Sequence, residues 1–137
     1  MKILVLDDHE ILRYPPDENL EDPHDYTKDE FTQTVNINQF VDFFFNKEWD
    51  EIWIDHDLGH PTKTGRTATK KIYQKLSEAG WKMKSNPIIR ITTTDDFVAK
   101  ILRSDFEGFG LRVIRAPLSS MRPYGVVSGK TLNTFDY

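Results

Sequence analysis

Two short apolar runs of this chain end in carboxylates, and this pattern constrains the fold more than any other sequence feature. Residues 2–6 are followed by Asp7-Asp8, and residues 51–54 are followed by Asp55-His56-Asp57. A carboxylate directly after a buried strand is costly to place among apolar neighbours unless it lies at an open sheet edge or holds a cation. In a parallel sheet such acids meet at the carboxyl ends of the strands, where open α/β folds bind ligands. The sequence therefore predicts a site for a divalent metal and a phosphate.

Composition excludes several other classes of protein. The 137 residues fit one domain with a single core, and the net charge of −4, with no block of Lys or Arg, argues against general nucleic-acid binding. The absence of cysteine excludes disulfides and thiolate metal sites. No apolar stretch approaches membrane-spanning length, and the first apolar run is too short for a signal peptide. We therefore expect a cytoplasmic protein with no membrane and no nucleic-acid partner.

Short apolar runs alternate with amphipathic segments along the chain. Alternating strands and helices require parallel pairing with right-handed crossovers. The expected architecture is a single α/β domain over 1–137, a three-layer, flavodoxin-like fold with a parallel five-stranded sheet and a core of about 2–117. Strands are expected at 2–6, 34–37, 51–54, 87–92 and 111–115, and helices at 39–47 after Asn38, from Thr64 or Thr67 to Gly80, and from near Asp95 to Gly108 or Gly110.

Two segments do not follow this alternation. Segment 9–32 contains Pro15, Pro16 and Pro23 and little helical periodicity, so it is interpreted as a long loop that replaces the first crossover helix. Segment 118–137 is a tail that the sequence leaves unassigned. In addition, apolar residues cover nearly the whole circumference of the expected helix at 39–47, so part of its aromatic surface is expected to meet the loop or a partner.

These pieces resemble a response-regulator receiver domain over about residues 2–117. The resemblance lies in the acid pair Asp7-Asp8 after the first strand, Asp55 after the third, Thr92 after the fourth and Pro117 after the fifth. The string Asp55-His56-Asp57-Leu58-Gly59, with Pro15-Pro16 and Thr64-Gly65, is more closely similar to the group described as cyclic-phosphate-processing receivers, which occur in bacteria and phages.

The resemblance implies roles for individual residues. Asp55 would be the phosphoacceptor, Asp7, Asp8 and Asp55 would hold Mg²⁺, and the Thr92 hydroxyl would bond the phosphoryl group. Receivers also place a lysine just before the proline, where this chain has Ala116. Arg115 is adjacent, but neighbouring strand residues point to opposite faces, so it does not replace that lysine. The resemblance therefore implies a divergent receiver or pseudo-receiver.

Two features near Asp55 have alternative interpretations. Asp57 is a further candidate metal ligand if the chain stays extended, because side chains at i and i+2 share a face. If a turn begins at His56, Asp57 instead caps the following loop. His56 and His9 either join the acids around a transition metal or only hydrogen-bond their own loops.

Three functions remain open. The first is a receiver-like Mg²⁺ and phosphate-binding module that signals through a protein partner, either a kinase or a downstream target. The second is a metal-dependent phosphohydrolase, either of a haloacid-dehalogenase-like type in which Asp55-x-Asp57 supplies nucleophile and general acid, or one that processes a cyclic phosphate. The third is a phage-type protein that binds a host factor without chemistry.

Overall fold

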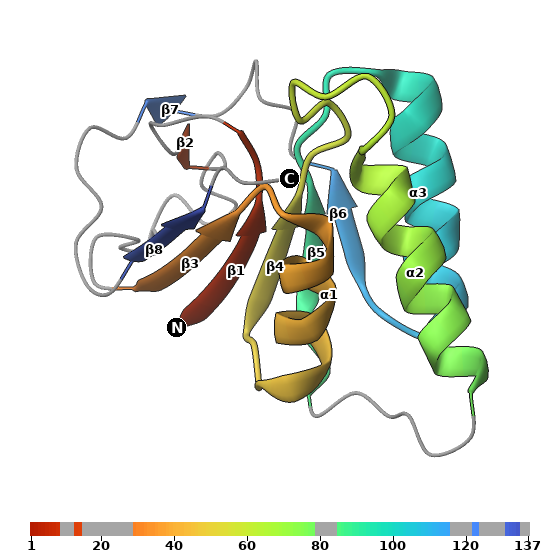
Figure 1. Cartoon of the computed structure of the whole chain (residues 1–137), viewed down its shortest axis with the longest axis horizontal. Coiled ribbons are helices and arrows are strands. Elements are labelled where there is room, and N and C mark those ends of the chain that lie inside the picture. The colour runs from red at the N-terminus through yellow and green to blue at the C-terminus, as the bar shows by residue number, and fades with distance from the viewer. Residues whose placement is uncertain (9–12, 15–28, 79–84, 116–121, 124–130, 135–137) are drawn as a thin grey trace, which may run out of the picture.

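A six-stranded parallel sheet forms the centre of the structure, which is a computed structural model (Figure 1). The structure describes residues 1–8, 13–14, 29–78, 85–115, 122–123 and 131–134. The sheet has the order β6-β5-β4-β1-β3-β8, and its members are β1 (Lys2–Leu6), β3 (Glu30–Thr34), β4 (Glu51–Ile54), β5 (Ile88–Ile91), β6 (Val113–Arg115) and β8 (Thr131–Thr134). A separate antiparallel pair joins β2 (Arg13–Tyr14) to β7 (Arg122–Pro123).

The arrangement of the strands confirms the predicted flavodoxin-like architecture. Strands β3-β1-β4-β5-β6 lie in the order 2-1-3-4-5 when they are counted along the chain, which is the order of that fold. All neighbours in this sheet pair in parallel. Strand β8, from the tail that the sequence left unassigned, adds a sixth strand beside β3.

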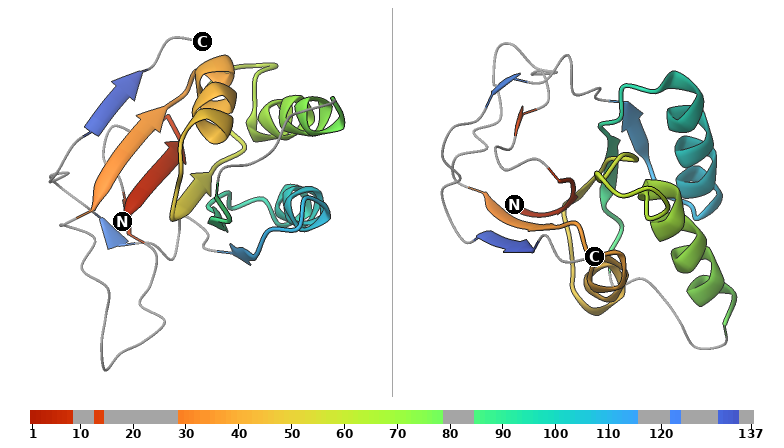
Figure 2. Two further views of the ribbon diagram at one scale, coloured as in Figure 1. Left: turned by 90° about the horizontal axis from the view of Figure 1, so that it is seen from below. Right: turned by 45° about the horizontal axis from the view of Figure 1, so that its top comes forward.

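Helices α1 (Ile37–Asn46), α2 (Gly65–Ser77) and α3 (Asp96–Gly108) follow β3, β4 and β5 and lie on one face of the sheet (Figures 1 and 2). The β2–β7 pair lies on the opposite side (Figure 2). None of the helices in the described part of the chain is both long enough and apolar enough to cross a membrane.

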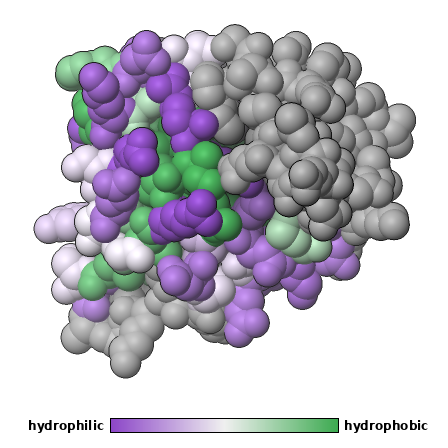
Figure 3. All heavy atoms as spheres, turned by 180° about the vertical axis from the view of Figure 1, so that it is seen from behind, coloured by the Kyte–Doolittle hydropathy of each residue, from purple (hydrophilic) through white to green (hydrophobic). Residues whose placement is uncertain are grey.

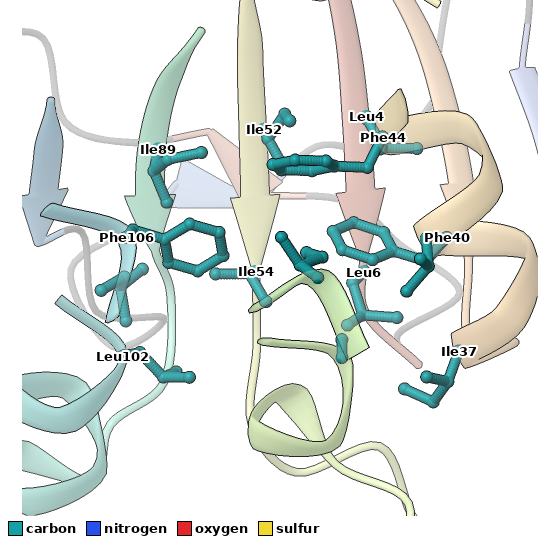
Figure 4. Packing of buried hydrophobic residues seen from close by; sticks show 14 of the residues in the cluster. Leu4, Leu6, Ile37, Phe40, Phe44, Ile52, Ile54, Ile89, Leu102 and Phe106 are labelled. Carbon is teal, nitrogen blue, oxygen red and sulfur yellow. The ribbon is translucent and has the colours of Figure 1, made fainter. Parts of the chain in front are cut away.

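The main core fills the space between the sheet and the helices. Alternate residues of the strands point into it because side chains on a strand alternate between faces. Figure 4 shows Leu4, Leu6, Ile52, Ile54 and Ile89 from the sheet, with Ile37, Phe40 and Phe44 from α1 and Leu102 and Phe106 from α3; all are at most 3% exposed.

The aromatic residues of α1 serve this core. Phe40, Phe44 and Phe45 are buried, and the half-buried Phe43 lies against Trp49 with ring centroids 6.5 Å apart. The Trp49 indole nitrogen donates to the Phe43 carbonyl at 2.7 Å. The expected aromatic surface of this helix is therefore taken up within the protein.

The opposite face of the sheet is buried as well, although it contains charged residues. Glu51 and Arg90 form an ion pair at 2.5 Å, and the Trp53 indole nitrogen donates to the same Glu51 carboxylate at 3.0 Å. All three residues are at most 7% exposed. Nearer the β6 edge, Ile88 and Ile114 are only half-buried, and apolar side chains are open to view in the middle of this side (Figure 3).

Several predicted boundaries were wrong. The second strand is not 34–37 but 30–34, so the predicted loop 9–32 includes three strand residues at its end as well as β2. The helix cap is Asn36 instead of Asn38, because the Asn36 side chain accepts the Gln39 amide at 2.8 Å. The strands predicted at 87–92 and 111–115 are shorter and span Ile88–Ile91 and Val113–Arg115. Helix α2 was predicted to end at Gly80 but ends at Ser77. Residues 9–12 and 15–28, with Gly80, Ala116 and Pro117, lie outside the described residues.

The buried ion pair gives a test of this face. Arg90→Met leaves the Glu51 carboxylate buried without its cation, which we expect to lower the free energy of unfolding by about 3–5 kcal/mol. The double variant Glu51→Met/Arg90→Met should recover much of this loss. Urea unfolding followed by Trp fluorescence measures both. The control Arg103→Met breaks an exposed pair with Glu107 and should cost less than about 1 kcal/mol; equal losses would contradict the assignment.

Candidate functional site

Three carboxylates meet at the carboxyl ends of β1 and β4. These strands pair with Leu6 opposite Ile54, so the next residues, Asp7 and Asp55, leave the sheet side by side. The Asp55 amide extends the ladder by donating to the Leu6 carbonyl at 2.9 Å. Ligand oxygens of Asp7, Asp8 and Asp55 all lie within 4.8 Å of one another. The predicted convergence of the two acidic stretches is thus present in the structure.

The donor set of this acidic cluster suits a hard divalent cation. Asp7 and Asp55 are each 6% exposed, and Asp8 is half-buried, so the cluster is accessible mainly from the side of Asp8. Carboxylates this close together repel unless positive charge lies between them. Magnesium takes oxygen ligands and keeps several waters, so these carboxylate oxygens, with water at the remaining positions, suit it.

The Asp55 carboxylate is held by its own backbone. Its Oδ1 accepts the His56 amide at 2.7 Å, which fixes the side chain over the start of the next loop. Asp55 is therefore oriented before any ligand arrives.

Asp57 lies apart from the acidic cluster. The chain bends at His56, and Asp57 is exposed, with its Oδ1 accepting the Gly59 amide at 3.0 Å. Gly59 has a φ of 70°, in the left-handed region that favours glycine. Of the two interpretations of Asp57, the geometry corresponds to the loop cap.

Thr92 is the first residue after β5 and is 3% exposed. Because Ile54 pairs with Ile91, Thr92 follows β5 at the same level as Asp55 follows β4. Its amide and its hydroxyl both donate to the Ile54 carbonyl, at 3.0 and 3.2 Å. The hydroxyl group thus lies at the same edge of the sheet as Asp55, and it donates its hydrogen to a backbone carbonyl.

His56 follows Asp55 in the bend and is half-buried. Its Nδ1 is buried and has no hydrogen-bond partner among the described residues. Burial lowers the pKa of His56; the charge of Asp95 opposes this shift, and Arg66 adds to it. The neutral imidazole is therefore favoured. His9, the other histidine of the predicted transition-metal alternative, lies outside the described residues.

Arg115 is directed to the loop after Thr92. Its guanidinium donates to the Thr93 carbonyl at 2.8 Å and to the Asp96 carboxylate at 3.0 Å. These contacts tie β6 to the start of α3. The expectation that Arg115 does not replace the lysine missing at position 116 is consistent with this geometry.

Sequence reasoning missed the role of Gly65, the first residue of α2. Its amide donates to the His56 carbonyl at 2.9 Å, and a Cβ at this position would lie 2.2 Å from the Asp55 carbonyl oxygen. No side chain fits against the backbone there. The sequence signal was a glycine directly after the helix cap Thr64, a position where helix propensity alone disfavours glycine.

We predict that Gly65→Ala displaces the loop after Asp55. The clash is with backbone, so the Asp55 peptide or α2 must shift, and we expect a loss of about 1–3 kcal/mol in the free energy of unfolding. The control is Gly108→Ala, where an added Cβ meets nothing within 4 Å and helix propensity favours alanine. Thermal unfolding of both variants measures the difference; equal stability of the two would contradict the close approach.

Comparison with known proteins shows the family of this chain. The chain matches the family model of the cyclic-phosphate processing receiver domain over residues 1–106, a range that includes the acidic cluster, Gly65 and Thr92 and ends before β6. No curated protein and no solved structure matches the chain. Since the model covers more than half of the chain, the protein belongs to the family of cyclic-phosphate processing receiver domains.

Proposed function

We propose that this receiver domain binds Mg²⁺ at Asp7, Asp8 and Asp55, accepts a phosphoryl group on Asp55 and signals through a protein partner in the cytoplasm. The observation that carries the proposal is the group of three carboxylates within 4.8 Å, two of them buried at the ligand-binding edge of a parallel sheet. The partner would be a kinase that supplies the phosphoryl group or a target that reads it.

Each residue of the site has a separate role in the proposed phosphoryl transfer. The oriented carboxylate of Asp55 is the nucleophile, and its attack on phosphorus breaks the bond to the leaving group of the donor. Asp7 and Asp8, together with Asp55, would hold the cation, and the cation would offset the charge of the phosphoryl oxygens. The Thr92 hydroxyl can exchange its hydrogen bond to the Ile54 carbonyl for one to a phosphoryl oxygen. The Thr92 amide keeps its own hydrogen bond to the Ile54 carbonyl, so the backbone does not have to move.

The missing lysine defines how this receiver differs from the usual kind. Ala116 offers no cation, and Arg115 is engaged with Thr93 and Asp96. The loss of one fixed charge beside the transferring group would raise the barrier by about 3–4 kcal/mol, by analogy with the loss of an oxyanion donor. We therefore infer slow phosphoryl transfer, in a divergent module whose main property is binding.

Hydrolysis of a phosphodiester or phosphomonoester is the second candidate. It is favoured by the exposed position of Asp57 two residues after Asp55, where this hypothesis places the general acid. Against it, the Asp57 carboxylate already caps the amide of Gly59. Binding without chemistry remains the third alternative.

We predict that Mg²⁺ raises the melting temperature of the protein and that Asp8→Asn and Asp55→Asn each weaken Mg²⁺ binding at least about tenfold. Differential scanning fluorimetry with a Mg²⁺ titration measures both quantities.

A matched control is Asp42→Asn, which removes an exposed acid of α1 that does not belong to the acidic cluster. It should keep the full response to Mg²⁺. If the parent protein shows no Mg²⁺ response, or if Asp42→Asn loses as much as Asp55→Asn, the metal site is wrong.

We predict that incubation with Mg²⁺ and acetyl phosphate produces a labile phosphoryl adduct that Asp55→Asn abolishes. Ala116→Lys should speed its formation about a hundred- to a thousandfold, because it restores the cation. Intact mass spectrometry over time measures the rate. No adduct on either protein would contradict Asp55 as phosphoacceptor, and turnover of a generic phosphate ester that Asp57→Asn abolishes would favour the hydrolase.

A further inference from the structure

A groove between α2 and α3 lies outside the acidic cluster. It encloses about 500 Å³ and is lined by Arg66, Lys70 and Tyr73 from α2 and by Ser104, Asp105 and Phe109 at the end of α3. The two helices are neighbours and contact each other (Figure 1). This volume is within the range of about 300–1,000 Å³ that is usual for ligand sites in proteins. We refer to it as the α2–α3 groove.

The charge of α2 is opposite to that of the whole chain. The helix contains four basic residues and no acidic residue, whereas the chain has a net charge of −4. Arg66 and Lys70, one turn apart, line the groove, while Lys71 turns away and donates to the Asn38 side chain at 2.7 Å. Asp105 is the acid of the groove, and it accepts the Thr69 hydroxyl at 3.3 Å. Two cations against one carboxylate leave the groove positive.

Arg66 carries a polar group that lacks an acceptor. Its Nε is buried, and no described residue accepts a hydrogen bond from it. An unsatisfied buried donor costs about 1–3 kcal/mol, and a donor on a charged group costs more. Most buried donors in proteins have a partner, so this atom is an exception, and it belongs to a residue that also lines the groove.

The far end of the groove has an aromatic floor. Tyr73 is 66% exposed, and its ring centroid lies 6.1 Å from that of Phe109. Phe109 in turn packs edge-on against the buried Phe106 at 5.8 Å, so the floor is continuous with the core. Exposed tyrosine beside arginine is the composition typical of residues that dominate protein–protein binding.

We propose that the α2–α3 groove docks an acidic segment of a partner protein, with carboxylates on Arg66 and Lys70 and an apolar anchor on Tyr73 and Phe109. Four residues of helix rise about 6 Å, and alternate residues of an extended peptide are about 6.6 Å apart on one side. The spacing of Arg66 and Lys70 therefore matches that of two acidic residues at alternate positions of an extended peptide. The apolar anchor is then the next residue on the same side of the peptide. The proposal does not depend on metal or phosphoryl binding at Asp55.

The test is a titration of the ¹⁵N-labelled full chain at low ionic strength with the blocked peptide Glu-Gly-Glu-Gly-Trp. We expect amide shifts at residues 66–73 and 104–109, and weaker binding as salt is added. Lys70→Gln and Arg66→Gln should each weaken binding about two- to fivefold, and Tyr73→Ala should reduce it further. The peptides Gln-Gly-Gln-Gly-Trp and Glu-Gly-Glu-Gly-Gly should bind more weakly than the parent peptide.

The matched control is Lys71→Gln, which removes the same charge from the other side of the same helix and should leave binding unchanged. No shifts in the groove, or an equal loss in Lys71→Gln and Lys70→Gln, would overturn the proposal. A single-stranded oligonucleotide that shifts the same amides more strongly than the peptide would also overturn it. The titration is repeated with chelator and with Mg²⁺: peptide binding in chelator supports the groove even if the metal site fails.

Discussion

The hydrogen bond from the Asp55 amide to the Leu6 carbonyl is the contact on which the site depends. It carries the pairing of β1 and β4 one residue beyond both strands, so that the side chains of Asp7 and Asp55 emerge together. A shift of one residue in this register would turn one of the two carboxylates to the opposite face of the sheet. The register is fixed by the apolar residues of both strands, which are buried on both faces. Packing of the sheet therefore determines the geometry of the acidic cluster.

The acids of the cluster could be predicted from the sequence because their positions follow from local rules. A buried strand followed by a carboxylate occurs twice, and parallel pairing then brings the two ends together. Asp57 could not be assigned in this way. Its spacing from Asp55 is informative only in an extended chain, and the bend at His56 turns it towards Gly59. The role of Gly65 depends on a contact between segments ten residues apart, which no local pattern reveals.

The same distinction explains which parts of the fold were predicted. Strands such as Glu51–Ile54 stand out because they are short and apolar, and they lie where the sequence placed them. Strand β3 has the sequence Glu-Phe-Thr-Gln-Thr, whose polar residues hid it, while the apolar Val35 and Ile37 moved the prediction several residues too far along the chain. The buried pair of Glu51 and Arg90 is another such case, because each charge is acceptable on that face only through the other.

The close approach of Gly65 to the Asp55 backbone excludes every residue except glycine from this position in a chain that folds in this way. A chain can retain every carboxylate of the cluster and still be unable to form the loop that orients Asp55, if any side chain occupies the first residue of the following helix. Glycine at this place is thus a steric requirement that is separate from the chemistry. When related chains are compared, the residue at this place tells which of them can build the pocket and which have only inherited its acids.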